Sequence, residues 1–131
     1  MNRDSLIQER KENSITRIFK AVFPNTTNHY DTLFGGTALH MMDEASFICA
    51  TRFSRKKVVT VSTNKIDFGK AIPQGSLVEL VAQVEKVGNT SCMVRVDIFM
   101  EDMYEDGREK VVTGEFTFVA IDDYKKPVSI L

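Results

Sequence analysis

The sequence predicts an α+β fold in which a curved antiparallel sheet wraps around one long central helix. Residues 33–54 read as a helix that is apolar on most of its surface, and four segments with strand-like composition follow it. Short turns join these segments, and strands joined by tight turns must be antiparallel. A helix that is apolar nearly all round has to be covered, and a sheet of five to six strands covers it economically.

Each element is predicted from its own residues. A first strand, rich in Ile, Phe and Val, is expected over 14–23, and a polar loop over 24–31. Asp31 or Thr32 can cap the helix, because a short side-chain oxygen satisfies a free N–H of the first turn. Apolar residues then alternate with a period of two, most clearly in the last three strands. The four strands are expected over 57–69, 76–88, 91–102 and 110–122.

The length of 131 residues indicates one domain. We expect a flexible N-terminal segment over 1–11, with weak order reaching residue 13, because this stretch is highly charged. The folded domain is expected over 12–124, and 125–131 is expected to be a loosely attached tail. A single curved sheet leaves edge strands unpaired, and pairing with a second copy would close them, so we expect a dimer.

Composition excludes several classes of partner and location. The net charge of −1 provides no overall field that attracts nucleic acid or an anionic membrane, so neither is expected as a partner. Cys49 and Cys92 lie in apolar surroundings without metal-ligand spacing, which is typical of buried thiols in a reducing compartment. The N-terminus does not resemble a signal peptide, and we see no apolar segment long enough to cross a bilayer. A cytoplasmic location is therefore expected.

Asp43 is the unusual residue of the predicted helix. Its neighbours one turn away, Leu39 and Phe47, are apolar, and the other polar residues form a stripe about a quarter-turn from it. These apolar neighbours suggest that the carboxylate is half-buried. Two interpretations stay open. Asp43 is either a satisfied acid bonded to a neighbouring backbone or hydroxyl group, or a general base or nucleophile that acts on a ligand.

Gly35 and Gly36 favour a ligand. Glycine destabilises a helix, so two of them in the first turn indicate that something approaches the backbone closely. The free N–H groups and positive dipole end of a helix N-terminus can hold an oxyanion. The alternative is that the glycines only allow close packing against a strand.

The stretches NTTNHYDTLFGGTALHMMDEAS and KKVVTVSTNKIDFGKAIPQGSLVEL resemble the hotdog-fold acyl-CoA thioesterases. More narrowly, they resemble the bacterial acyl-CoA hydrolases related to the brain-type acyl-CoA hydrolase. The resemblance covers roughly residues 12–124. It implies a long helix wrapped by an antiparallel sheet, and a dimer with two sites at its interface, commonly assembled into a hexamer as a trimer of dimers. It also implies hydrolysis of acyl-CoA to free acid and CoA without a metal or an organic cofactor.

The resemblance also implies catalytic residues. Asp43 from one subunit would work with Asn28 from the other, and Thr60, a hydroxyl on the strand after the helix, would belong to the same site. Without the resemblance, Asn28 reads as a turn residue and Thr60 as an ordinary strand threonine. The thioester carbonyl would point at the backbone near Gly36. Asp43 would deprotonate a water or attack directly, and the sequence leaves both routes open.

The phosphates of CoA require cations. Arg55, Lys56 and Lys57, together with Arg52, form the tight basic cluster of the sequence, although a role in complementing the helix dipole is equally compatible with it. A turn after the second of the four strands could offer backbone and hydroxyl groups to a phosphate or pantetheine amide, or be a plain hairpin. Its residues are Gly88, Asn89, Thr90 and Ser91.

Three rival functions are compatible with parts of the sequence. A non-catalytic acyl-CoA sensor would normally carry an effector domain, for which this chain has no room. A hydratase or dehydratase of acyl thioesters would use a histidine with an acid at a spacing that is absent here, and we assign no chemical role to His29 or His40. A purely structural oligomer leaves the double glycine unexplained.

Overall fold

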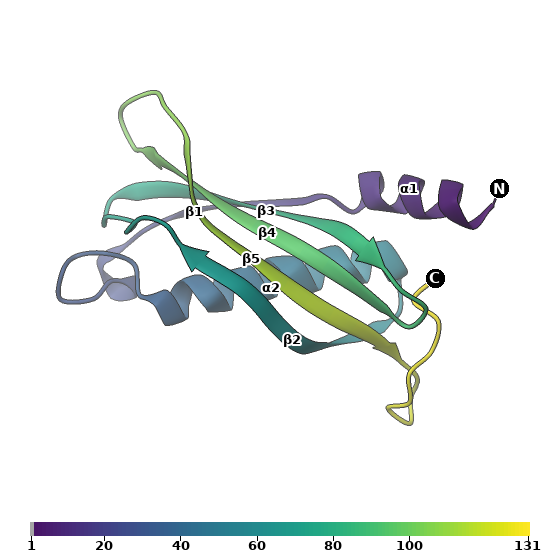
Figure 1. The fold of residues 1–131 in the computed structure, drawn as a ribbon. Helices are drawn as coiled ribbons and strands as arrows, with labels where there is room; N and C mark the ends of the chain where they lie inside the picture. The colour runs from purple at the N-terminus through teal and green to yellow at the C-terminus, as the bar shows by residue number, and fades with distance from the viewer. Residues whose placement is uncertain (1) are drawn as a thin grey trace.

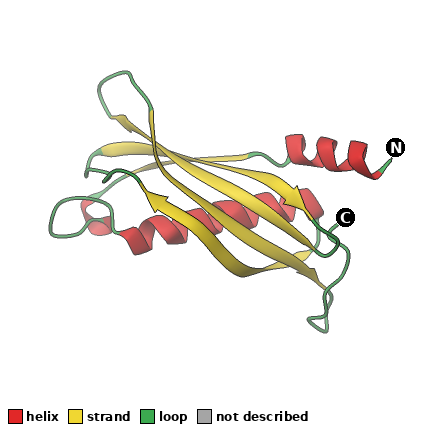
Figure 2. Ribbon diagram, in the orientation of Figure 1, coloured by secondary structure: helices red, strands yellow, loops and turns green. Residues whose placement is uncertain are grey.

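The computed structural model describes residues 2–131. A five-stranded antiparallel sheet curves around helix α2 (Gly35–Ser54), which lies along its inner face (Figures 1 and 2). This arrangement confirms the α+β fold expected from the sequence. The strands are β1 (Thr16–Ala21), β2 (Lys57–Phe68), β3 (Ser76–Val87), β4 (Ser91–Asp102) and β5 (Glu109–Ile121).

The strand order β1-β3-β4-β5-β2 makes β1 and β2 the edges of the sheet. The core lies between α2 and the inward-facing residues of β3, β4 and β5, where apolar side chains alternate along each strand as the period of two predicts. Gly114 of β5 lies under the helix. A Cβ atom there would lie 2.3 Å from Cδ1 of Ile66 and 3.0 Å from Cε of Met42, so the absence of a side chain lets these two residues pack.

The N-terminal segment is ordered, which corrects the expectation of weak order. Helix α1 (Arg3–Asn13) begins after Asn2, whose side chain accepts a hydrogen bond from the Ser5 N–H. Arg3 donates to the carbonyl oxygen of Gly88 at 2.9 Å, and Lys11 to that of Glu85 at 3.0 Å. Two charged side chains therefore anchor the helix to the end of β3, although none of its residues is buried.

The C-terminal tail is also packed, contrary to the expectation of loose attachment. Ile130 is fully buried, and its N–H donates to the carbonyl oxygen of Asn89 at 2.9 Å. The Val128 N–H donates to the carbonyl oxygen of Ala120. Hydrophobic burial of Ile130 against the core holds the tail in place.

Helix α2 begins two residues later than expected, and neither Asp31 nor Thr32 caps it. The residue before the helix is Phe34, which provides no side-chain cap. Asp31 adopts a left-handed conformation with φ of 59°, and Thr32 directs its hydroxyl to the side chain of Asn28. These two residues shape the loop instead of the helix terminus.

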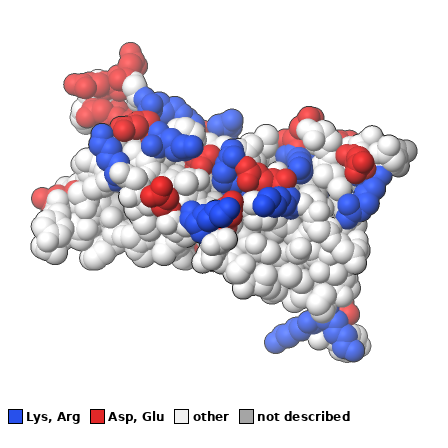
Figure 3. Space-filling model, viewed as in Figure 1, with Lys and Arg blue, Asp and Glu red and all other residues white. Residues whose placement is uncertain are grey.

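Strand β2 is the exposed edge of the sheet. Val59 and Val61 are 41% and 53% exposed, and the neighbouring face of α2 exposes Leu39 and Phe47. Charged side chains gather over the outer face of the sheet, whereas much of the surface over β2 and α2 is uncharged (Figure 3). An open strand edge beside exposed apolar side chains is typical of an interface between copies.

Candidate active site

The loop before α2 is organised by Asn28. Its side-chain oxygen accepts hydrogen bonds from the N–H groups of Tyr30 (2.9 Å) and Thr32 (3.2 Å), and from the Thr32 hydroxyl (3.1 Å). The Asn28 side-chain NH₂ group makes no hydrogen bond within residues 2–131. Asn28 therefore serves as the turn former that local sequence suggests, and it keeps a donor available for another group.

The first turn of α2 presents free backbone donors. Within residues 2–131, the N–H groups of Gly35 and Gly36 have no hydrogen-bond acceptor. No atom lies within 4 Å of the position that a Cβ of Gly36 would occupy, and the nearest atom to that of Gly35 is Cζ of Phe68 at 3.9 Å. Close packing within this chain therefore does not explain the double glycine, because a Cβ atom would fit at both positions.

Asp43 and Thr60 are in contact across the space between α2 and β2. The Thr60 hydroxyl donates to Oδ1 of Asp43 at 3.0 Å. The pairing of β2 with β5 shifts between Thr60 and Ser62, which marks an irregularity in the strand next to this contact. A hydroxyl that donates to one carboxylate oxygen holds the carboxylate in one orientation and leaves the other oxygen available.

Asp43 is exposed in this chain, which corrects the expected half-burial. Leu39 and Phe47, one turn to either side, are 36% and 46% exposed and do not enclose the carboxylate. The reason is that β2, the edge strand, leaves this face of α2 uncovered. Reactants can therefore reach the carboxylate directly in a single subunit.

A groove of about 330 Å³ connects the carboxylate to the helix N-terminus. Besides Gly36, Asp43 and Thr60, its walls include residues that the sequence did not single out for the site. These are Leu39, His40, Thr63 and Phe116. Helical spacing from Asp43 places Leu39 and His40 on the same side, and the period of two in β5 directs Phe116 inward, so these signals were present in the sequence. Thr63 carried no such signal, because the irregularity in β2 is invisible from sequence.

The basic cluster separates into two parts. Arg55, Lys56 and Lys57 line a second cavity of about 500 Å³ at the C-terminal end of α2. Arg52 instead donates to the carbonyl oxygens of Asn13 and Ile15 and to the Thr16 hydroxyl, so it fastens α1 and β1 to the helix. In this chain the Arg52 guanidinium is occupied by structural contacts.

Two lysines of the cluster also have partners within the chain. Lys56 donates to the carbonyl oxygen of Ser129 at 2.5 Å, and Lys57 forms an ion pair with Asp123. Arg55 has no salt-bridge partner within residues 2–131. The ion pair of Lys57 lies in solvent, so it can exchange for a phosphate at small cost.

The turn between β3 and β4 is a tight hairpin away from the groove. The Gly88 N–H donates to the carbonyl oxygen of Ser91, and the carbonyl oxygens of Asn89 and Thr90 accept from Ile130 and Ala120. None of these four turn residues lines the groove that contains Asp43. The structure of a single chain therefore does not bring the turn to the carboxylate.

Comparison with known proteins identifies the family. The model of the Thioesterase superfamily matches residues 30–106, which include the helix with Asp43 and the strand with Thr60. The chain belongs to the Thioesterase superfamily. Together with the five strands wrapped around α2, this membership confirms the hotdog fold that the sequence predicts.

Several relatives of this superfamily member are named as acyl-CoA hydrolases. An uncharacterised acyl-CoA thioester hydrolase of Bacillus subtilis is 38% identical over 120 residues, covering 92% of this chain and 69% of that protein. An acyl-CoA hydrolase from Staphylococcus aureus, solved with butyryl coenzyme A, is 36% identical with a TM-score of 0.87, covering 91% of this chain and 73% of that one. A hexameric acyl-CoA thioesterase is 32% identical with a TM-score of 0.88, covering 91% and 76%.

The S. aureus enzyme has also been solved as three variants, in which an aspartate, a threonine or an asparagine is replaced by alanine. The chain of this superfamily member spans 60% to 72% of the length of the first curated relatives that it matches.

The described part of this superfamily member contains neither a metal-binding group of side chains nor a membrane-spanning helix. Within residues 2–131, no three His, Cys, Asp or Glu side chains are grouped so that they could hold a metal ion. No helix in this part of the chain is both long and apolar enough to span a bilayer.

Proposed function

We propose that this chain hydrolyses acyl-CoA thioesters to the free acid and CoA in the groove between α2 and β2. The contact of the Thr60 hydroxyl with the accessible Asp43 carboxylate carries the proposal. Gly36, whose N–H is free, lines the same groove, which supports a base and an oxyanion site in one cavity. The butyryl coenzyme A held by the S. aureus relative supports this class of substrate.

In the proposed mechanism, the thioester carbonyl oxygen accepts hydrogen bonds from the N–H groups of Gly35 and Gly36. These donors and the positive end of the α2 dipole stabilise the negative charge that develops on the oxygen as the carbonyl carbon is attacked. Donors of this kind contribute about 10²–10³ in rate. Because the amides are already free and fixed by the helix, they need no rearrangement to act.

Asp43 supplies the attacking group by one of two routes. It takes a proton from a water that attacks the carbonyl carbon, or it attacks that carbon itself and forms a mixed anhydride that water then hydrolyses. In both routes the carbon–sulfur bond breaks, CoA leaves as a thiolate and the acid is released. The hydrogen bond from Thr60 orients the carboxylate in either route.

We place the CoA phosphates toward the C-terminal end of α2. Arg55, Lys56 and Lys57 line the cavity there, and Arg55 has no competing carboxylate among the described residues. Arg52 contributes to the fold rather than to this contact. The hydroxyl groups of the turn residues Thr90 and Ser91 are further candidates for CoA, with Gly88 and Asn89 offering the backbone of the turn.

We further propose that two subunits complete each site. The open β2 edge and the exposed Leu39 and Phe47 provide the surface for a second copy. Asn28 does not line the groove of its own chain, and its free NH₂ group is a suitable donor to a substrate bound by the partner. The hexameric relative supports assembly of such dimers into a trimer of dimers. The proposal includes no nucleic acid or membrane partner, and it places the protein in the cytoplasm.

The proposed chemistry needs no metal or organic cofactor, because a carboxylate, a hydroxyl and backbone amides supply the base and the oxyanion donors. The test is release of CoA thiol from butyryl-CoA in the presence of a chelator. We expect hydrolysis by the wild type, and a 10²–10⁴-fold lower kcat for Asp43→Ala, about the contribution of a general base. Substantial turnover by Asp43→Ala would overturn the site, and tight binding without turnover in the wild type would indicate a sensor.

Asn28 needs a matched pair of variants, since it also holds the loop together. Asn28→Ala removes both the loop contacts and the NH₂ donor, whereas Asn28→Asp keeps the oxygen that accepts from Tyr30 and Thr32 and removes only the donor. We expect both variants to lose activity. Full activity in Asn28→Asp would show that the NH₂ group does not contact the substrate.

A further inference from the structure

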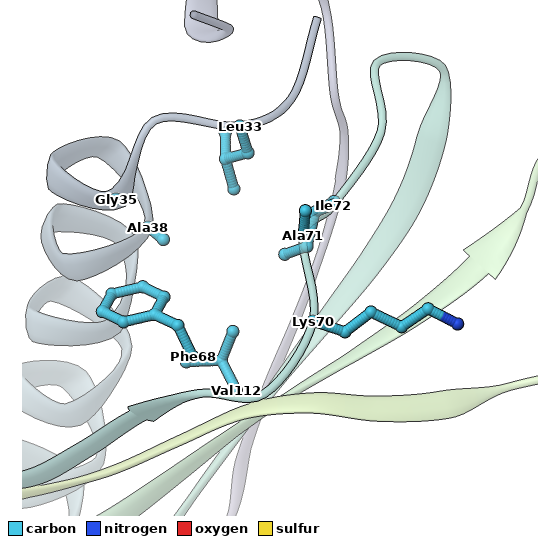
Figure 4. Close-up of a pocket in the computed structure, with 8 residues that line it drawn as sticks. All are labelled: Leu33, Gly35, Ala38, Phe68, Lys70, Ala71, Ile72 and Val112. Carbon is cyan, nitrogen blue, oxygen red and sulfur yellow. The ribbon is translucent and has the colours of Figure 1, made fainter. Parts of the chain in front are cut away.

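A third cavity opens beside the groove at the N-terminal end of α2. It has a volume of about 280 Å³ and is enclosed by the helix, the end of β2, the β2–β3 connection and β5 (Figure 4). Its walls are apolar and largely buried. They include Leu33, Ala38, Ile72 and Val112, each at most 8% exposed. The one charged wall residue, Lys70, directs its ammonium group away from the cavity and pairs with Glu109 at 3.1 Å.

The cavity and the catalytic groove follow one another along the same helix and strands. On α2, Gly36 and Leu39 line the groove, whereas Gly35 and Ala38 line the cavity. On β5, Phe116 lines the groove. Val112 lies four residues earlier on the same face of the strand and lines the cavity. The two spaces are therefore neighbours at the first turn of α2, where Gly35 lines one and Gly36 lines the other.

The far side of the cavity is closed by backbone hydrogen bonds. The Leu33 N–H donates to the carbonyl oxygen of Ile72 at 2.8 Å, and Thr32 bridges to Pro73. These contacts tie the loop before α2 to the β2–β3 connection. Phe68 stands at the side toward Gly35 and is 48% exposed. The loop before α2 and the β2–β3 connection thus form one continuous wall of the cavity.

We propose that this cavity receives the hydrocarbon end of the acyl chain and makes medium-length acyl groups the preferred substrates. The inference rests on the proposed function. A thioester whose carbonyl oxygen lies at the Gly36 N–H has two arms. If the CoA arm extends toward the basic residues at the C-terminal end of α2, the acyl arm extends toward the apolar cavity at its N-terminal end. Transfer of methylene groups from water into this cavity favours binding.

The volume sets the preferred length. A cavity of about 150 Å³ lined by Leu, Ile and Phe holds a molecule the size of benzene, so about 280 Å³ accommodates a chain of roughly six to ten carbons. Each methylene that enters an apolar pocket raises kcat/KM about four-fold when its burial is complete in the transition state. We therefore expect kcat/KM to rise from butyryl-CoA to a maximum near octanoyl- or decanoyl-CoA and to fall or level off for longer chains.

Two variants change the cavity in opposite directions. Ala38→Leu fills it, so the optimum should move to shorter chains, and the ratio of kcat/KM for octanoyl-CoA to that for butyryl-CoA should fall at least ten-fold. Ile72→Ala enlarges it, so the optimum should move to longer chains. Ile130→Ala is the matched control, because Ile130 is also a buried isoleucine but lies at the opposite end of the molecule. This variant should keep the wild-type optimum of acyl-chain length.

The measurement is the release of CoA thiol from saturated acyl-CoAs of four to sixteen carbons, each kept below its micelle concentration. A wild-type kcat/KM that does not depend on chain length or that keeps rising up to sixteen carbons, or an Ile72→Ala optimum identical to that of Ile130→Ala, would overturn the inference while leaving the proposed hydrolase intact. Absence of turnover with every acyl-CoA would instead reject the hydrolase itself. If Ala38→Leu does not fold, the comparison of the two isoleucine variants still decides.

Discussion

At the scale of single residues, the contact between Thr60 and Asp43 is the feature that distinguishes this acid from an ordinary surface carboxylate. Glu44, the next residue of the helix, is also exposed but does not line the groove. A hydrogen bond to a charged group contributes about 1.5–3 kcal/mol, whereas a solvated carboxylate has no fixed orientation. The hydrogen bond from β2 therefore orients Asp43, the one of these two adjacent acids that we propose as the reactant.

Removing this donor should reduce catalysis without preventing folding. We expect Thr60→Val to lower kcat/KM by about 10- to 100-fold, because it removes one hydrogen bond to the carboxylate and keeps the shape of the side chain. Thr60→Ser is the matched control, since it retains the hydroxyl and should retain most of the activity. Equal activities of the Val and Ser variants in the thiol-release assay would show that the hydrogen bond has no catalytic role.

The two buried cysteines give a prediction for pH. Burial raises the pKa of the Cys49 thiol from 9.0 to about 11 and that of the Cys92 thiol to about 12. Because the folded state holds these protons more tightly than the unfolded state, their contribution to stability is complete below pH 9. It is lost as the pH rises from 9 toward 12.

We expect the free energy of unfolding, measured with denaturant, to decrease above pH 9, and the decrease to be smaller in Cys92→Ala than in the wild type. Folded protein at pH 8 should also react slowly with a thiol reagent, and unfolded protein quickly. Rapid reaction of both thiols in the folded protein would contradict their burial. Slow reaction also means that the protein adds little background to a thiol-release assay.

The sequence predicted the position of some residues of the site but not the surroundings of others. The motif around Gly36 and Asp43, together with the later threonine, indicated the contact that the structure shows. The exposure of Asp43 was not predictable, because it depends on which strand lies at the edge of the sheet. The structural use of Arg52 was not predictable either, since its partners lie 36 to 39 residues away in the sequence.

At the scale of elements, strands with a regular period were predicted well and the terminal segments were not. The bounds of β3, β4 and β5 agree with the predicted strands to within about one residue, because apolar residues on one face can only pack on α2 in that register. Helix α1 and the C-terminal tail were missed because distant partners hold them. Arg3 contacts Gly88, 85 residues away, and Ile130 contacts Asn89.

Gly114 provides a test of how closely α2 packs on the sheet. We expect Gly114→Ala to destabilise the protein by about 1–3 kcal/mol, because the added Cβ would crowd Ile66 and Met42 in a filled core. Gly36→Ala is the matched control, since open space surrounds its Cβ position. Thermal unfolding of both variants measures the difference. A Gly114→Ala variant as stable as the wild type would show that the core has room at this point.

At the scale of the whole molecule, we propose that one chain alone presents an incomplete site. The groove is open along the exposed edge strand β2, and Asn28 lies outside it. A second copy placed against β2 would cover the apolar residues beside the carboxylate and could bring its own Asn28 to the groove. The same surface would then close the sheet edge, bury apolar area and complete the catalytic group.

The most direct measurement mixes two inactive variants, Asp43→Ala and Asn28→Asp, by co-expression or by refolding them together in equal amounts. If each site takes Asp43 from one subunit and Asn28 from the other, half of the dimers are mixed and each of these has one intact site. The mixture should then regain about a quarter of the wild-type activity toward octanoyl-CoA. Activity no higher than that of the separate variants, in mixtures shown to contain mixed dimers, would contradict a site shared between subunits.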